Sequence, residues 1–114
     1  MKPFFVDRIQ VLLFREDLWW IGFVVDLYIV SQGKTIDDAK LDMEYALAVT
    51  EYLHRDPLVA AVPRAPVEIR ERFSIARMNE QRPSRFYIEG ESPQEIEYRI
   101  DKNEPITDDE LADD

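Results

Sequence analysis

The 114-residue chain suits a single domain, and its lack of cysteine excludes disulfides and thiolate metal sites. No apolar run reaches the roughly 18–20 residues of a membrane span, and charges interrupt the apolar N-terminal stretch, which favours a cytoplasmic protein. The net charge of −10, from 24 acidic and 14 basic residues, disfavours direct nucleic-acid binding, because that binding needs cations opposite the phosphates.

The acidic surplus is concentrated near the C-terminal end of the sequence. Residues 101–114 carry a net charge of −6, which leaves −4 for the rest of the chain. The sequence therefore predicts one domain over residues 1–100, followed by a flexible acidic tail over residues 101–114. Such a tail either keeps the protein solvated or steers it toward a basic partner. The tail residues predicted to meet that partner are Asp108, Asp109, Glu110, Asp113 and Asp114.

The first half of the chain begins with a predicted β-hairpin. The stretch "FFVDRIQVLLFR" is rich in β-branched and aromatic residues and predicts a strand centred on Ile9–Phe14. "LWWIGFVVDL" predicts the returning strand, although the break "EDL" between them lacks the Asn-Gly or Asp-Gly signal of the tightest turns. "LYIVSQG" is consistent with a short third strand that ends at Gly33.

The second strand places its two adjacent tryptophans on opposite faces. One face is uniformly apolar and comprises Trp19, Ile21, Phe23 and Val25. The other face is broken by a glycine and a carboxylate and comprises Leu18, Trp20, Gly22, Val24 and Asp26. We predict that Trp19 packs beneath the following helix, with the reverse assignment of faces as the alternative. On this prediction Trp20 lies on the second face, where the glycine leaves room for something to approach.

A long helix is predicted after Gly33. Thr35 is a suitable N-cap, and Asp38 completes a pattern similar to a capping box. Apolar residues then recur at spacings of three and four, and they are Ile36, Ala39, Met43, Ala46, Leu47, Thr50 and Leu53. The helix is predicted to end near Arg55, because Pro57 disfavours helical geometry at the preceding residue.

Additional strands are predicted after residue 66. The stretch "VEIRERFSIAR" at residues 67–77 alternates apolar and charged residues, with a slip near Glu71 that is typical of a β-bulge. "SRFYIE" and "EIEYRI" each predict a further strand. For the last of these, Ser92, Pro93 and Glu95 also form a helix-start signal, so strand and helix both stay open.

The ordered series "WWIGF", "VVDLYIV", "SQGKT" and "IDDAKLDMEYAL" resembles the HicB-like antitoxin domain over about residues 9–55. The resemblance implies an α+β fold in which one long helix packs across a small antiparallel sheet, similar to a reduced RNase H-like fold. Members of that family typically cover the active surface of a small, basic, RNA-cleaving toxin, HicA. Residues 56–114 show no paired helices with a basic recognition face, so the expectation is a stand-alone relative without the usual C-terminal DNA-binding domain.

The leading prediction is therefore a non-catalytic, protein-binding module that uses no cofactor or metal. The partner-binding residues predicted on the second sheet face are Trp20, Asp26 and Tyr28, together with the acidic tail. The alternative for that face is that residues 67–100 fold over it as a second core layer. Two other functions stay open: an acidic phage-type inhibitor that mimics nucleic acid to block a host defence nuclease, and an oligomeric protein that binds a small ligand. Exposed strand edges also make a homo-oligomer plausible.

Overall fold

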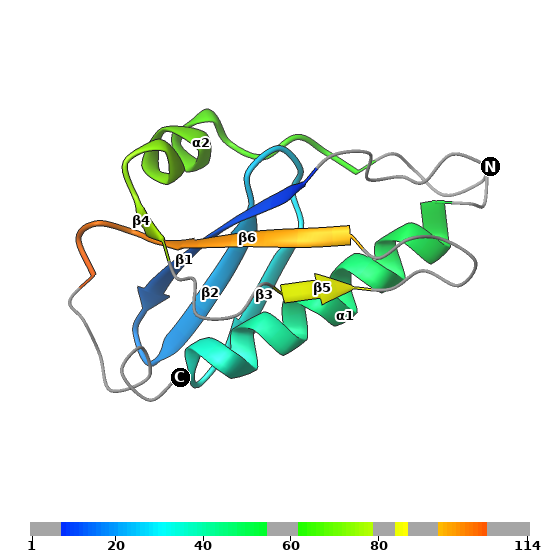
Figure 1. Ribbon diagram of the computed structural model, residues 1–114, viewed down its shortest axis with the longest axis horizontal. Coiled ribbons are helices and arrows are strands. Elements are labelled where there is room, and N and C mark those ends of the chain that lie inside the picture. The colour runs from blue at the N-terminus through cyan, green and yellow to red at the C-terminus, as the bar shows by residue number, and fades with distance from the viewer. Residues whose placement is uncertain (1–7, 55–61, 79–83, 87–93, 105–114) are drawn as a thin grey trace.

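The computed structural model describes residues 8–54, 62–78, 84–86 and 94–104, which form an α+β fold (Figure 1). The strands are β1 (Ile9–Glu16), β2 (Trp19–Val24), β3 (Val30–Gly33), β4 (Arg77–Met78), β5 (Ser84–Phe86) and β6 (Gln94–Ile100). The helices are α1 (Ile36–His54) and α2 (Val67–Ser74). Neither of these described helices is long and apolar enough to cross a membrane.

The strands form one mixed sheet in the order β3-β2-β1-β6-β4, and β5 also pairs with β6. The predicted hairpin of β1 and β2 is confirmed, with Asp17 in its turn at a φ of 57° that aspartate tolerates. The third strand is confirmed as β3, antiparallel to β2. However, β6 runs parallel to β1, so the prediction of an antiparallel sheet is wrong for this pair. A hairpin pattern in the sequence predicts pairing only between strands that are consecutive in the chain. β1 and β6 lie near opposite ends of the described residues, so no such pattern predicts their orientation.

The long helix predicted after Gly33 is confirmed as α1. Its first free amides are capped as expected, because the N–H of Asp38 donates to Thr35 Oγ1 at 3.1 Å. One side of the helix packs on the sheet, and its fully buried residues are Ile36, Ala39, Met43 and Leu47. Most of the length of helix α1 therefore packs against one face of the sheet.

Gly33, the last residue of β3, lies directly against the first turn of α1. A Cβ atom on Gly33 would lie 2.4 Å from the backbone nitrogen of Ala39 and 2.6 Å from two atoms of Asp38. No side chain fits there without moving the first turn of α1. The Gly-x-Thr pattern thus has two separate physical roles, since Gly33 permits close packing and Thr35 caps the helix.

The assignment of the two tryptophans is the reverse of the predicted one. Trp20 is 1% exposed and lies in the core beneath α1, whereas Trp19 is 40% exposed. Gly22 marks the crowded face of β2, because a Cβ there would lie 2.5 Å from Oγ of Ser31 on β3 and 3.4 Å from Cε of Met43 on α1. The glycine leaves room for an approaching group, as expected, and that group is the Ser31 side chain, whose hydroxyl donates to the carbonyl of Ala39 on α1 at 3.0 Å. Trp20 and Val24, on either side of Gly22, consequently face the helix.

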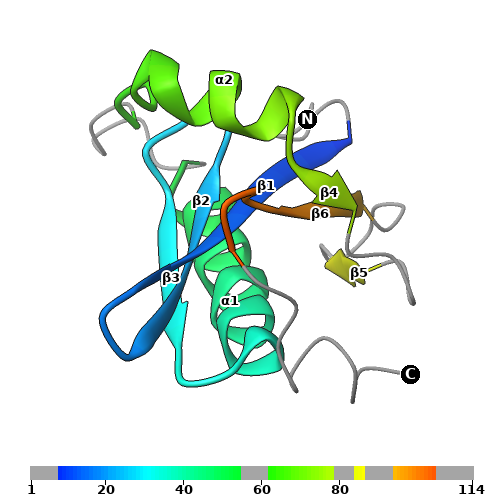
Figure 2. The same ribbon diagram turned by 90° about the vertical axis from the view of Figure 1, so that its left-hand side faces the viewer.

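The stretch at residues 67–77 is not a bulged strand, as predicted, but contains helix α2. Ile69 and Phe73 are buried, while Val67 and Ile75 are exposed. The alternation is interrupted near Glu71 because Ile69 and Phe73 are four positions apart, the spacing that places two side chains on one face of a helix. Helix α2 crosses the sheet face opposite α1 (Figure 2). Its two buried residues form a second core cluster with Leu12, Phe23 and Val25.

Strands β4, β5 and β6 confirm the prediction of additional strands after residue 66. The open choice for "EIEYRI" is decided in favour of a strand, with Ile96, Tyr98 and Ile100 buried toward α1. Ser92 and Pro93, which carry the competing helix signal, lie outside the described residues. In this segment, the alternation of apolar and charged residues predicts the strand correctly, whereas the residues typical of a helix start do not indicate the observed structure.

Candidate protein-binding surface

Helix α2 covers only part of its sheet face and leaves the remainder open to solvent. Trp19 and Val30 are each 40% exposed there, and Tyr28 is 54% exposed. The strand register places half-buried Ile21 beside half-buried Phe14. We call these five residues, Phe14, Trp19, Ile21, Tyr28 and Val30, the open sheet face.

Of the predicted partner-binding residues, Tyr28 belongs to this surface and Asp26 lies at its border. The ring of Tyr28 meets that of Phe23 edge-on, with 5.0 Å between centroids, and its backbone N–H donates to the carbonyl of Pro63 at 2.8 Å. Asp26 is exposed, and its carboxylate forms an ion pair with Arg70 of α2. The structure therefore keeps Asp26 and Tyr28 at the surface, on the connection between β2 and β3 and next to α2.

Trp20, the third predicted partner-binding residue of the sheet, does not reach this surface. It is buried under α1, and the guanidinium of Arg15 lies 5.7 Å from its ring centroid. Trp19 occupies the exposed position instead, next to exposed Glu16 in the register. Gly22 carried the signal that could have separated the two, since a residue without a side chain in a strand marks the face that a neighbouring element approaches.

Arginines on α2 fix one border of the open sheet face. The guanidinium of Arg72 lies 4.4 Å from the ring centroid of Phe14, and its Nε lies 2.6 Å from Oδ2 of Asp101. Arg70, two residues earlier on α2, pairs with Asp26. The contact between Arg72 and Asp101 joins α2 to the first residue of the acidic segment.

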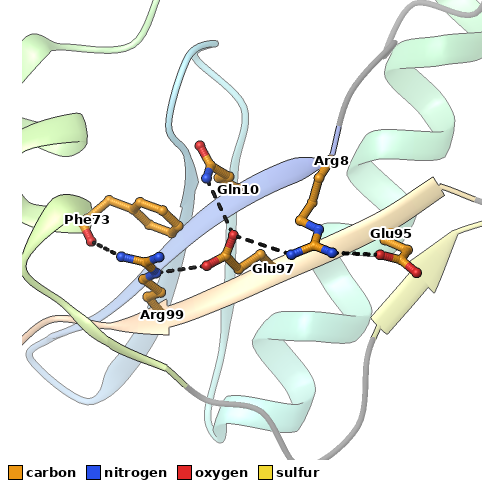
Figure 3. Close-up of polar contacts among 6 residues, drawn as sticks. All are labelled: Arg8, Gln10, Phe73, Glu95, Glu97 and Arg99. Atoms are coloured by element: carbon orange, nitrogen blue, oxygen red, sulfur yellow. Dashed lines mark hydrogen bonds and ion pairs between the residues drawn. The ribbon is translucent and has the colours of Figure 1, made fainter.

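A network of charged residues occupies the β6 side of the same face (Figure 3). The Glu97 side chain is 7% exposed and accepts hydrogen bonds from Nε of Arg99 at 2.9 Å and from Nε2 of Gln10 at 3.4 Å. Arg8 lies 4.0 Å from Glu97 and pairs with Glu95 at 3.1 Å. Because its carboxylate is already bonded on several sides, Glu97 fits a structural role.

Arg99 links this network to α2 (Figure 3). Its Nη1 donates to the carbonyl oxygen of Phe73 at 3.2 Å, and its guanidinium lies 4.5 Å from the Phe73 ring centroid. A cation beside the last carbonyls of a helix is favoured by the helix dipole. Arg99 and Arg72 together hold α2 against the sheet, which gives the open sheet face a fixed edge.

The beginning of the acidic segment is part of the folded body. Asp101 is 4% exposed, and its N–H donates to the carbonyl of Leu13 at 2.9 Å. Glu104 accepts from the backbone N–H of Arg15 at 2.9 Å. The predicted partner-binding residues farther along, Asp108, Asp109, Glu110, Asp113 and Asp114, lie outside the described residues.

The environment of Asp101 favours its charged form. Burial alone would raise its pKa, but the backbone N–H of Asn103 and the guanidinium of Arg72 outweigh that effect and hold the pKa below its ordinary value. A carboxyl whose pKa is lower in the folded state stabilises the fold at any pH above its unfolded pKa. That contribution is lost as the pH falls through the folded value.

We therefore expect Asp101→Asn to lower the free energy of unfolding at pH 7 by about 1–3 kcal/mol, because Arg72 loses its charged acceptor. The difference between wild type and variant should shrink as the pH falls below about 4, where the wild-type carboxyl also becomes neutral. Urea unfolding followed by circular dichroism at several pH values measures both effects. A difference that stays constant down to pH 2 would contradict this role for the charge.

The described ranges contain no group of three or more histidine or acidic side chains that could hold a metal ion. The fold and surface define an α+β domain with a long helix on one sheet face and, on the other, an open apolar region beside a short helix. No model of a protein family, no curated protein and no solved structure matches this chain.

Proposed function

We propose that this protein is a non-catalytic protein-binding module that acts as a HicB-like antitoxin or a relative of one. It would bind a small basic protein, for which an RNA-cleaving toxin is the precedent. The observation that carries the proposal is the open sheet face, on which Trp19, Tyr28 and Val30 are exposed together. Exposed aromatic residues grouped on a rigid sheet are typical of the centre of a protein interface.

The order of elements gives the proposal independent support. A hairpin, a third strand, Gly33-x-Thr35 and the long helix α1 are followed later by β6, which lies parallel to β1 at the centre of the sheet. We propose that this arrangement corresponds to the reduced RNase H-like fold expected of a HicB-like domain. Helix α2, which covers part of the second face, is an addition to that expected pattern.

The charges around the open sheet face favour a basic partner. Exposed Glu16 lies beside Trp19 at one end of the surface. The arginines Arg70 and Arg72 on its border are already paired with Asp26 and Asp101 of this chain, so they add no unpaired positive charge. A toxin that binds RNA presents cations to phosphates, and Glu16 would pair with such a cation while the apolar centre blocks access.

The test is a purification of the tagged full-length chain from its native host after nuclease treatment, with bound proteins identified by mass spectrometry. We expect wild type to retain one small basic protein whose RNA cleavage is inhibited by an equimolar amount of this chain. The double variant Trp19→Ala/Tyr28→Ala should lose both binding and inhibition. Val67→Ala removes an apolar side chain that is 74% exposed at the start of α2, and it serves as the matched control.

Other outcomes would redirect the assignment. Recovery of a large nuclease would favour the inhibitor that mimics nucleic acid. Recovery of no protein, together with a stable oligomer, would favour a ligand-binding protein. Equal loss of the partner in the control variant and in the double variant would contradict the open sheet face as the binding surface.

A further inference from the structure

Helix α1 carries a second row of apolar side chains that does not face the sheet. Leu41 is 64% exposed, Tyr45 is 71% exposed and Tyr52 is 74% exposed. Ala48 is also exposed and lies between the two tyrosines. We call these four residues the outer seam.

The outer seam is continuous along the helix. Its residues follow one another at intervals of four, three and four, the spacing that keeps side chains in line on one side of a helix. The core-facing residues of α1, such as Met43 and Leu47, lie on the opposite side. The helix is thus apolar on two sides, and only the inner side is covered by described residues.

This pattern differs from the scattered exposed apolar residues that every protein has. A single exposed leucine needs no explanation, because much of any protein surface is apolar. Three large side chains in line, each more than half exposed, form a patch of the kind found at interfaces, and tyrosine is among the residues enriched at binding hot spots.

The exposed charged residues of α1 that lie beside the outer seam are all acidic. The exposed residues that flank it in the first half of the helix are Asp37, Asp38 and Asp42. No exposed residue of α1 between Asp37 and Leu53 is basic. Lys40 is buried on the inner side, with its Nζ 5.1 Å from the ring centroid of Tyr98. A partner for this surface must therefore bring its own positive charges.

We infer that the outer seam of α1 is a docking surface for a basic amphipathic helix of another protein. Apolar residues of that helix would pack along Leu41, Tyr45 and Tyr52, and its lysines or arginines would face the flanking aspartates. A second copy of this chain suits the surface poorly, because two such seams would place acidic flanks together with no exposed cation between Asp37 and Leu53 to pair with them. The inference does not rest on the proposed function, since α1 and the open sheet face lie on opposite sides of the sheet.

The experiment is a titration of the isotope-labelled full-length protein, followed by amide NMR, with a synthetic helical peptide as the probe. The peptide is about three heptads long, with leucine at the a and d positions and lysine elsewhere. A peptide of the same composition, scrambled so that leucines do not share a side, is the control. We expect saturable amide shifts along the outer seam with the first peptide only, and an affinity that falls as salt is added.

The matched variants are Tyr45→Ala/Tyr52→Ala on the outer seam and Val67→Ala on α2, across the sheet. All three side chains are more than half exposed, so the variants are expected to fold, which a thermal melt checks. The double variant should weaken peptide binding by about tenfold or more, and Val67→Ala should leave it unchanged.

Three results would overturn the inference. Equal binding of the scrambled peptide would mean that charge alone is recognised. Shifts confined to the open sheet face would place the peptide elsewhere. A dimer in light scattering that the double variant abolishes would assign the outer seam to a second copy of this chain.

Discussion

Replacing Trp20 by alanine is expected to lower the free energy of unfolding by about 3–5 kcal/mol. The side chain is 1% exposed and is among the largest fully buried side chains in the described residues. It packs between the sheet and α1, so its removal leaves a cavity among tightly packed neighbours that can close only partly. A loss of this size is a large share of the roughly 5–15 kcal/mol that stabilises most domains.

Trp19→Ala is the matched control, because it removes the same side chain one position away on the other face of β2. With Trp19 40% exposed, we expect it to cost clearly less than the loss at Trp20. Urea unfolding of both variants, followed by far-ultraviolet circular dichroism, measures the two losses. Equal losses, or the larger loss at Trp19, would contradict the assignment of the sheet faces.

Replacing Gly33 by alanine is expected to destabilise the protein by about 1–3 kcal/mol or more. The new methyl group would overlap the backbone of the first turn of α1, which cannot rotate away as a flexible side chain can. The turn would have to lift from the sheet, and the hydrogen bond between Asp38 and Thr35 Oγ1 would be strained with it.

Lys34→Ala changes the next residue, which is exposed, and is the control for this experiment. It should alter the free energy of unfolding by less than about 0.5 kcal/mol. Thermal and urea unfolding of both variants give the comparison. If Gly33→Ala were as stable as Lys34→Ala, the close contact between β3 and α1 could not be as the structure describes it.

The predictions that succeeded rest on local patterns. The period and capping residues of α1 indicated a helix from Ile36, and the structure begins it there. The apolar and aromatic runs indicated a hairpin followed by a short third strand, and the structure shows them as β1, β2 and β3. In each case the signal and the structure involve residues within a few positions of one another, so one sequence is enough to read them.

The surfaces proposed here were only partly visible in the sequence. Asp26 and Tyr28 were identified as surface residues, and the structure keeps them exposed next to α2. Trp19 was placed on the wrong face because the more apolar side of β2 was taken as the one beneath α1. In the structure both sides of β2 contribute to a core, so apolar content alone does not distinguish them. The sequence also contains a second helical stripe, formed by Leu41, Tyr45, Ala48 and Tyr52. It was not identified, because the prediction considered only the apolar stripe that packs on the sheet.

The sequence by itself determined the α+β class, the position of α1, the β1–β2–β3 order and the acidic surplus. Only the tertiary structure decided which tryptophan is buried, that Val67–Ser74 is a helix and that β6 lies parallel to β1. It also decided that Asp101 belongs to the folded body through Arg72 and Leu13. The physical reason is that the residue pattern of a strand shows which side chains share a face, but not which face a helix covers. That choice depends on packing between segments far apart in the chain.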